Sequence, residues 1–142
     1  MKDKHPSSKH RIDTEIVTVG RHPAEQFGYV NPPVYRGSTV LYPDLESFKQ
    51  RKARYPYGRY GSPTTDSLEE GMTLLEGGAG TVLTSSGLSA IAVALQACLK
   101  SGDHLLLTDS CYAPTRKFCD GLMSRFGVTI EYYDPHIGSG IA

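Results

Sequence analysis

Metal-binding and redox motifs are missing from this 142-residue sequence. Its three cysteines, Cys98, Cys111 and Cys119, are odd in number and lack the Cys-x-x-Cys spacing of zinc and thioredoxin-like sites. The five histidines are scattered, and none stands at a metal-finger distance from a cysteine. We therefore expect reduced thiols and no metal site.

Long hydrophobic runs are missing as well. The longest apolar stretch, residues 88–99, is interrupted by Ser89 and Gln96 and falls short of the ~18 residues that a membrane-spanning helix needs. No apolar core follows the charged start of the chain, which excludes a signal peptide. The basic-aromatic runs of nucleic-acid platforms are absent too. These absences predict a cytoplasmic protein without membrane or nucleic-acid partners.

The chain has no net charge, but its charges are unevenly distributed. Residues 1–60 hold eleven Lys or Arg against six Asp or Glu, a balance of +5, and residues 61–142 hold four against nine, a balance of −5. A basic arm that contacts another subunit or an anionic ligand has this pattern, and so does a solvated charged surface. Charge alone leaves both possibilities open, and it distinguishes only a basic N-terminal arm, residues 1–60, from an acidic remainder, residues 61–142.

The arm is expected to contain little regular structure. Residues 1–11 are polar and expected to be mobile, and residues 12–43 are expected to be irregular because Asn31-Pro32-Pro33 forces an extended path. A short charged helix is expected to begin after Asp44, whose side chain would serve as its N-cap.

The next helix is better marked. Asp66 with Glu69 three residues later has the pattern of a capping box, and Gly77-Gly78 is expected to end the helix. Three apolar side chains fall on one face of this helix, which needs a packing partner: Leu68, Met72 and Leu75.

From Gly80 onward, strand and helix patterns alternate. Strands are predicted at about 80–84, 104–108 and 128–133, with helices at about 87–99 and 113–126 closed by Gly102 and Gly127. Strands that start 24 residues apart, with a helix between each pair, are typical of βαβ units in a parallel sheet. The predicted fold class is α/β. The sheet is incomplete, because parallel sheets normally continue on both edges.

Two short segments together look like a phosphate site. In Ser85-Ser86-Gly87-Leu88-Ser89-Ala90, a predicted strand gives way to a helix whose first N–H groups would point at an anion. In Tyr57-Gly58-Arg59, a phenol and a guanidinium stand two residues apart. In an extended segment they would project from the same side, because side chains alternate with period two.

The order of the motifs resembles the opening of the pyridoxal-phosphate enzymes of cysteine and methionine metabolism. The similarity covers roughly residues 12–140 and, within the family, is greatest to the bacterial cystathionine β-lyases. Several spaced motifs in one order argue against chance. The segments that carry the resemblance are Asn31-Pro32-Pro33-Val34, Ser38-Thr39-Val40, Tyr57-Gly58-Arg59 with Pro63-Thr64, Leu75-Glu76-Gly77-Gly78, Ser86-Gly87-Leu88-Ser89-Ala90 and Tyr112-Ala113-Pro114-Thr115.

The resemblance implies a fold of the pyridoxal-phosphate transferase type and a site for pyridoxal 5′-phosphate. It also implies that residues 1–60 form an N-terminal arm and inter-subunit loop, and that residues 61–142 begin the cofactor-binding large domain. The backbone N–H groups of Gly87 and Leu88 would hold the cofactor phosphate, and Tyr57 and Arg59 would reach the phosphate in the neighbouring subunit of a homodimer or homotetramer. Tyr112 would stack on the pyridine ring, and Tyr57 would also assist proton movement, which makes these two tyrosines the catalytic candidates. Taken without the family, the same residues fit a strand-to-helix turn, an arginine in a Gly-rich loop and a half-buried structural tyrosine.

The implied activity is α,β-elimination of the amino-acid substrate L-cystathionine to homocysteine, pyruvate and ammonia in methionine biosynthesis. A γ-synthase or γ-lyase of the same family would share these features, although Gly58 and the segment 112–120 favour the β-lyase. A nucleotide-binding module would need Gly-x-Gly-x-x-Gly after the first strand, which the chain lacks.

Three functional residues of the family match nothing in this chain. They are the lysine that holds the cofactor, the carboxylate on the pyridinium nitrogen and the arginine that binds the substrate carboxylate. We therefore expect either the N-terminal portion of a longer enzyme or a non-catalytic truncated product. In both cases the 142-residue chain is expected to be inactive by itself.

Overall fold

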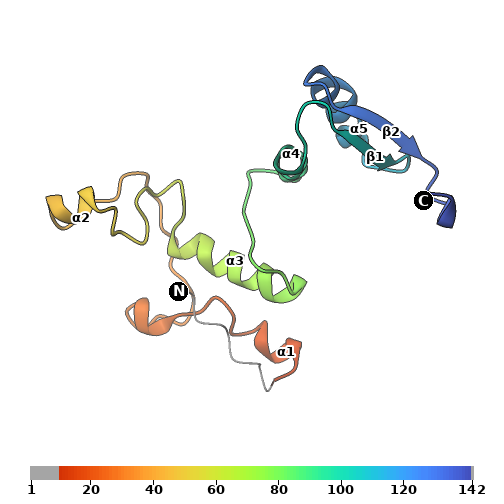
Figure 1. Cartoon of the computed structure of the whole chain (residues 1–142). Coiled ribbons are helices and arrows are strands. Elements are labelled where there is room, and N and C mark those ends of the chain that lie inside the picture. Colours follow the sequence, from red (N-terminus) through yellow and green to blue (C-terminus); the bar gives the residue numbers. More distant parts are fainter. Residues whose placement is uncertain (1–9, 142) are drawn as a thin grey trace. The chain divides into compact units, whose positions relative to one another are not determined.

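The computed structural model describes residues 10–141, and the chain divides into two compact units, with the boundary in the sequence between Leu83 and Thr84 (Figure 1). Most of the polar segment 1–11, for which the sequence predicts mobility, lies outside the described residues. The functional division expected at residue 60, between arm and large domain, stays a prediction.

The first unit contains three short helices before its one long helix. They are α1 (Ile12–Glu15), η1 (Pro23–Glu25), a 3-10 turn, and α2 (Leu45–Lys49). The expectation that residues 12–43 are wholly irregular was therefore wrong for two single turns. The predicted N-cap of α2 is confirmed, because the Asp44 carboxylate accepts a hydrogen bond from the Ser47 backbone N–H at 2.6 Å.

The long helix of the first unit, α3 (Pro63–Glu76), begins earlier than the sequence indicates. Its N-cap is Ser62, and the two residues Ser62 and Thr65 form a capping box: the Ser62 hydroxyl accepts from the Thr65 backbone N–H, and the Thr65 hydroxyl accepts from the Ser62 backbone N–H. The predicted capping box at Asp66 was wrong, because the Asp66 carboxylate binds side chains from another segment. The predicted end is confirmed: Gly77 adopts the left-handed conformation, with φ of 61°.

The N-terminal segment packs against small and polar residues of α3. Gly20, with φ of 73°, lies so close to the Ser67 backbone that an added Cβ would stand 2.4 Å from its carbonyl oxygen. His22 Nε2 lies 2.7 Å from Glu70 Oε2. The predicted apolar face of α3 stays largely exposed, with Leu68 53% and Leu75 47% accessible.

The second unit is a parallel α/β arrangement, as the sequence predicts. Helix α4 (Gly87–Cys98) is followed by strand β1 (His104–Thr108), helix α5 (Ala113–Phe118), the π-helical turn η2 (Cys119–Met123), strand β2 (Thr129–Tyr133) and the 3-10 turn η3 (Gly138–Ile141). Strands β1 and β2 pair in parallel, and His104 stands opposite Thr129 (Figure 1). Gly127, with φ of 83°, closes the helical segment before β2 as predicted. The prediction that Gly102 closes α4 was wrong, because α4 ends in an extended Leu99 and Gly102, with φ of 92°, lies in the turn before β1.

The predicted strand at 80–84 is the main departure. These residues form no strand, because no segment of the described chain pairs with them. A strand pattern specifies an extended backbone, but a strand forms only where a neighbour supplies the ladder of hydrogen bonds.

The core of the second unit is small and lies around η2. Its buried apolar residues are Cys119, Met123 and Val128, and Thr115 from α5 is buried beside them. All three cysteines are free thiols. Among residues 10–141, no helix is long and apolar enough to cross a membrane, and no group of three potential metal ligands occurs.

Candidate functional site

The segment that carries Tyr57 and Arg59 is a turn. The Tyr60 backbone N–H donates to the Tyr57 carbonyl at 2.9 Å, and the two tyrosine rings meet edge to face with centroids 5.5 Å apart. The expectation that period-two alternation aligns Tyr57 with Arg59 was therefore wrong. Both side chains are exposed, and Arg59 contacts no carboxylate within the described chain.

The turn is anchored to a neighbouring loop through Gly58. The Gly58 N–H donates to the Ser38 carbonyl at 2.7 Å. A Cβ at Gly58 would lie 2.5 Å from the Gly37 carbonyl oxygen, so the close approach of the two backbones requires glycine. Gly58 is therefore held in place, and Tyr57 and Arg59 flank it in the chain.

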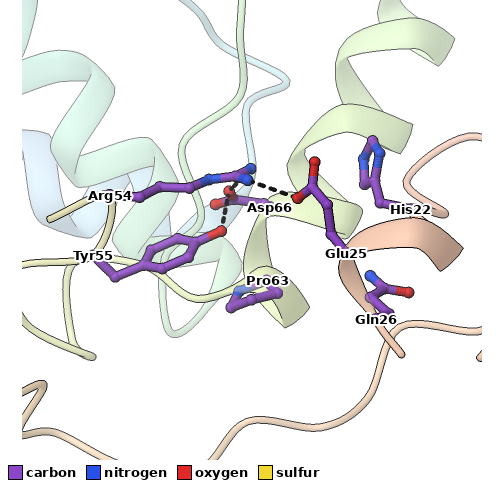
Figure 2. A pocket seen from close by; sticks show the side chains of 7 residues that line it. All are labelled: His22, Glu25, Gln26, Arg54, Tyr55, Pro63 and Asp66. Carbon is purple, nitrogen blue, oxygen red and sulfur yellow. Dashed lines mark hydrogen bonds and ion pairs between the residues drawn. The ribbon is translucent and has the colours of Figure 1, made fainter. Parts of the chain in front are cut away.

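A charged cluster lies just before this turn. Arg54 bridges two carboxylates: Nη1 is 3.0 Å from Glu25 Oε2, and Nη2 is 2.9 Å from Asp66 Oδ2. The Tyr55 hydroxyl donates to the same Asp66 oxygen at 2.7 Å (Figure 2). The cluster lines a cavity of about 200 Å³ together with His22, Gln26 and Pro63.

Electrostatics keep the Tyr55 hydroxyl a donor. Burial of the phenol, which is the largest cause, and its hydrogen bond to Asp66 raise the pKa of Tyr55 well above its usual value. The phenol therefore stays protonated at neutral pH, where it can donate to the Asp66 carboxylate.

The N-terminus of α4 presents two unused backbone donors. The Ser86 side chain accepts from the Ser89 N–H at 3.1 Å, and the Ser86 carbonyl accepts from the Ala90 N–H at 3.0 Å. Within the described chain these bonds leave the N–H groups of Gly87 and Leu88 without a partner, as expected for the first turn of a helix.

Gly87 leaves room in front of these donors. Apart from its chain neighbours and the backbone of its own helix, no heavy atom of the described residues lies within 4 Å of the position that a Cβ at Gly87 would take, and Gly87 does not have a positive φ. Neither packing nor backbone conformation within the chain requires glycine here. A ligand that approaches the helix N-terminus closely would require glycine at this position. A phosphate would suit both the two N–H donors and the positive end of the helix dipole.

Tyr112 stands where the sequence places it, beyond the carboxyl end of β1. It is the N-cap residue of α5, and its carbonyl accepts from the Thr115 N–H at 2.8 Å. Its side chain is exposed rather than half-buried, with 63% accessible. The ring is therefore free to cover a flat ligand.

The loop before Tyr112 is held by a second charged cluster. Arg116 on α5 donates to the Asp109 carbonyl at 2.8 Å and pairs with its carboxylate. The Arg116 guanidinium also lies over the Tyr132 ring, 3.7 Å from its centroid, and the Tyr132 hydroxyl donates to Asp120 at 2.7 Å. Burial and the Asp120 hydrogen bond raise the pKa of Tyr132 to about 12.

The structure thus groups the predicted residues into two sets. Tyr57 and Arg59 share one turn of the first unit, whereas Gly87 and Leu88 share one helix terminus of the second. Tyr112 lies at the start of α5, which packs against α4. Sequence reasoning missed the cluster of Glu25, Arg54, Tyr55 and Asp66, because it joins three separate segments of the chain and carries no motif.

The chain is similar to known proteins along nearly its whole length. A Saccharomyces cerevisiae protein whose name assigns it provisionally to cystathionine beta-lyase is 54% identical over 141 residues, which are 99% of this chain and 41% of that protein. Cystathionine beta-lyase MetC of Escherichia coli is 37% identical over 136 residues, 92% of this chain and 34% of that protein. Cystathionine gamma-synthase 1 of Nicotiana tabacum is 36% identical over 128 residues, 83% of this chain and 24% of that protein.

The fold agrees as well. The crystal structure of metB from Corynebacterium glutamicum superposes with a TM-score of 0.80 at 28% identity, over 89% of this chain and 32% of that one. The chain spans about two-fifths or less of the length of these relatives. The family described as "Cys/Met metabolism PLP-dependent enzyme" matches residues 13–142. The chain therefore belongs to this pyridoxal-phosphate-dependent family.

Proposed function

We propose that the protein of which this chain forms the matched part is a carbon–sulfur lyase that converts L-cystathionine to homocysteine, pyruvate and ammonia by α,β-elimination. One observation carries the proposal: the match to cystathionine β-lyases runs through nearly the whole chain and reaches 54% identity. The family match over residues 13–142 supports the same cofactor chemistry.

The residues of the chain fit the phosphate end of the cofactor. The two unpaired N–H groups at Gly87 and Leu88 would donate to phosphate oxygens at the helix N-terminus, where negative charge is favoured. Arg59 is exposed and unpaired within the described chain, so its planar guanidinium would supply two parallel charge-assisted hydrogen bonds to the same group.

Two tyrosines would serve the rest of the site. The exposed ring of Tyr112 would cover one face of the pyridine ring and exclude water from it. The Tyr57 hydroxyl would accept or return a proton beside the substrate. Pyridoxal phosphate, when bound, supplies the electron sink that lets an α-proton and a β-thiolate leave an amino acid.

Arg59 and Tyr57 are proposed to serve the site of a neighbouring subunit. They occupy a separate compact unit from Gly87, Leu88 and Tyr112, on a turn anchored through Gly58. An enzyme with this arrangement is at least a homodimer, and a homotetramer satisfies it equally. We also propose that it acts in the cytoplasm.

A second candidate is cystathionine γ-synthase or γ-lyase activity, which the 36% identity to the Nicotiana tabacum protein favours. The two classes differ in their products. Intact protein supplied with pyridoxal phosphate and L-cystathionine is expected to release pyruvate and homocysteine in equal amounts. Release of 2-oxobutyrate and cysteine would contradict the β-lyase assignment, and so would condensation of cysteine with an activated homoserine as the main reaction.

A further inference from the structure

The Asp66 carboxylate accepts hydrogen bonds from the side chains of two consecutive residues. Arg54 Nη2 and the Tyr55 hydroxyl lie 2.9 and 2.7 Å from the same oxygen of Asp66, in the first turn of α3 (Figure 2). The Asp66 side chain is 25% exposed, and the Arg54 guanidinium carbon lies 5.2 Å from the Tyr55 ring centroid. In an extended segment the side chains of Arg54 and Tyr55 would point in opposite directions. Because both bind one oxygen of Asp66, the backbone that joins them is constrained.

Asp66 also lies at the far end of the same loop. The Tyr57–Tyr60 turn starts two residues after Tyr55 and leads through Gly61 into α3, so that the loop departs from Asp66 and returns to it. A Cβ at Gly61 would lie 3.7 Å from the Tyr55 ring and 3.8 Å from the Asp66 carboxylate. Both ends of the loop therefore meet at this side chain.

The middle of the loop is fixed independently. Gly58 binds the Ser38 carbonyl and has no room for a side chain. Because its two ends are held at Asp66 and its middle at Ser38, the loop has little freedom to displace the backbone of Arg59. Asp66 is engaged by Arg54 and Tyr55, and no carboxylate of the described chain pairs with Arg59.

We propose that Asp66 is a positioning residue: by holding Arg54 and Tyr55 it fixes the turn from which Arg59 reaches the cofactor phosphate. This inference rests on the proposed function, because it assumes that Arg59 binds that phosphate. Asp66 itself touches neither cofactor nor substrate.

The test compares pyridoxal 5′-phosphate with pyridoxal, which lacks the phosphate, in the intact protein. Arg59→Ala is expected to weaken binding of the phosphorylated form about tenfold to a hundredfold and to leave pyridoxal unchanged. Asp66→Asn is expected to weaken the phosphorylated form about threefold to tenfold, again without effect on pyridoxal. In the Arg59→Ala background, Asp66→Asn is expected to have no further effect.

A matched control is Glu25→Gln, which removes the other, exposed partner of Arg54 and leaves Tyr55 on Asp66. We expect cofactor affinity within about twofold of wild type, because exposed ion pairs contribute little. If Asp66→Asn does not fold, Tyr55→Phe repeats the cycle by removing one hydroxyl, with the same expected direction.

The outcomes separate the two claims. Equal losses for pyridoxal and its phosphate, or additive losses for Asp66→Asn and Arg59→Ala, would show a merely structural Asp66 and overturn the inference while the proposed function stands. An Arg59→Ala protein that binds the phosphorylated cofactor as tightly as wild type would overturn the proposed phosphate site, and the role of Asp66 with it.

Discussion

Replacing Tyr112 in the intact protein should separate cofactor binding from folding. The side chain is 63% exposed, and the hydrogen bond that begins α5 uses the Tyr112 carbonyl rather than its ring. Tyr112→Ala should therefore change the free energy of unfolding by no more than about 0.5 kcal/mol, as expected for an exposed position. Its effect on cofactor affinity should be much larger.

The expected loss of affinity follows from the free area of the ring. A tyrosine side chain offers about 150–250 Å², so 63% exposure leaves on the order of 100–150 Å², of which one face is about half. Covering about 60 Å² at about 25 cal/mol per Å² gives ~1.5 kcal/mol. Ring pairing adds about 0.5–1.5 kcal/mol. The sum, about 2–3 kcal/mol, weakens binding about 30-fold to 150-fold.

Titration of pyridoxal phosphate into cofactor-free protein measures this loss. Tyr112→Phe keeps the ring and should bind within about threefold of wild type. Tyr29→Ala is the matched control, because Tyr29 is 70% exposed and has no assigned role. Equal affinity for Tyr112→Ala and wild type would refute the stacking role.

Three further predictions concern the turn, the second cluster and the isolated chain. Gly58→Ala should cost about 1–3 kcal/mol of stability in chemical denaturation, because the new Cβ meets the Gly37 carbonyl at 2.5 Å. Gly71 lies within α3, and its added Cβ would contact the Val19 side chain at an ordinary 3.8 Å, so Gly71→Ala should instead be neutral or stabilising. The phenolate absorbance of Tyr132 should appear with a midpoint near pH 12. The raised pKa means that the stability it contributes is complete below pH 10 and lost as the pH rises toward 12; a Tyr132 titration near pH 10 would contradict this. Borohydride treatment of the isolated 142-residue chain with pyridoxal phosphate should yield no stoichiometric pyridoxyl-lysine peptide, and one such peptide would show that the chain contains the cofactor lysine.

Local patterns predicted the second unit well. Periodicity and backbone preference, which act over a few residues, predicted strand 104–108, the helix that begins at Gly87 and the left-handed Gly127. The strand expected at 80–84 failed because a strand depends on a neighbour, and the sequence of a segment does not say whether one is present.

The first unit shows the opposite case. Asp66 fits a helix cap by sequence, yet its carboxylate binds Arg54 and Tyr55, and Ser62 caps the helix instead. The turn at Tyr57 likewise depends on the Ser38 backbone. The candidate cofactor residues were chosen from the motifs, whereas the contacts that position them are long-range and became visible only in the structure.

The central claim is a cofactor phosphate site shared between subunits, and subunit complementation tests it most directly. Intact Arg59→Ala protein, assayed at a pyridoxal-phosphate concentration too low to load it, is mixed with protein whose cofactor lysine is replaced. Each is then inactive alone, and subunit exchange is verified. If Arg59 serves the neighbouring site, each mixed dimer has one site with both defects and one site with neither, so that activity on L-cystathionine should return to about a quarter of wild type. Activity that stays at background after complete exchange would contradict the account, because Arg59 would then serve its own subunit or no site at all.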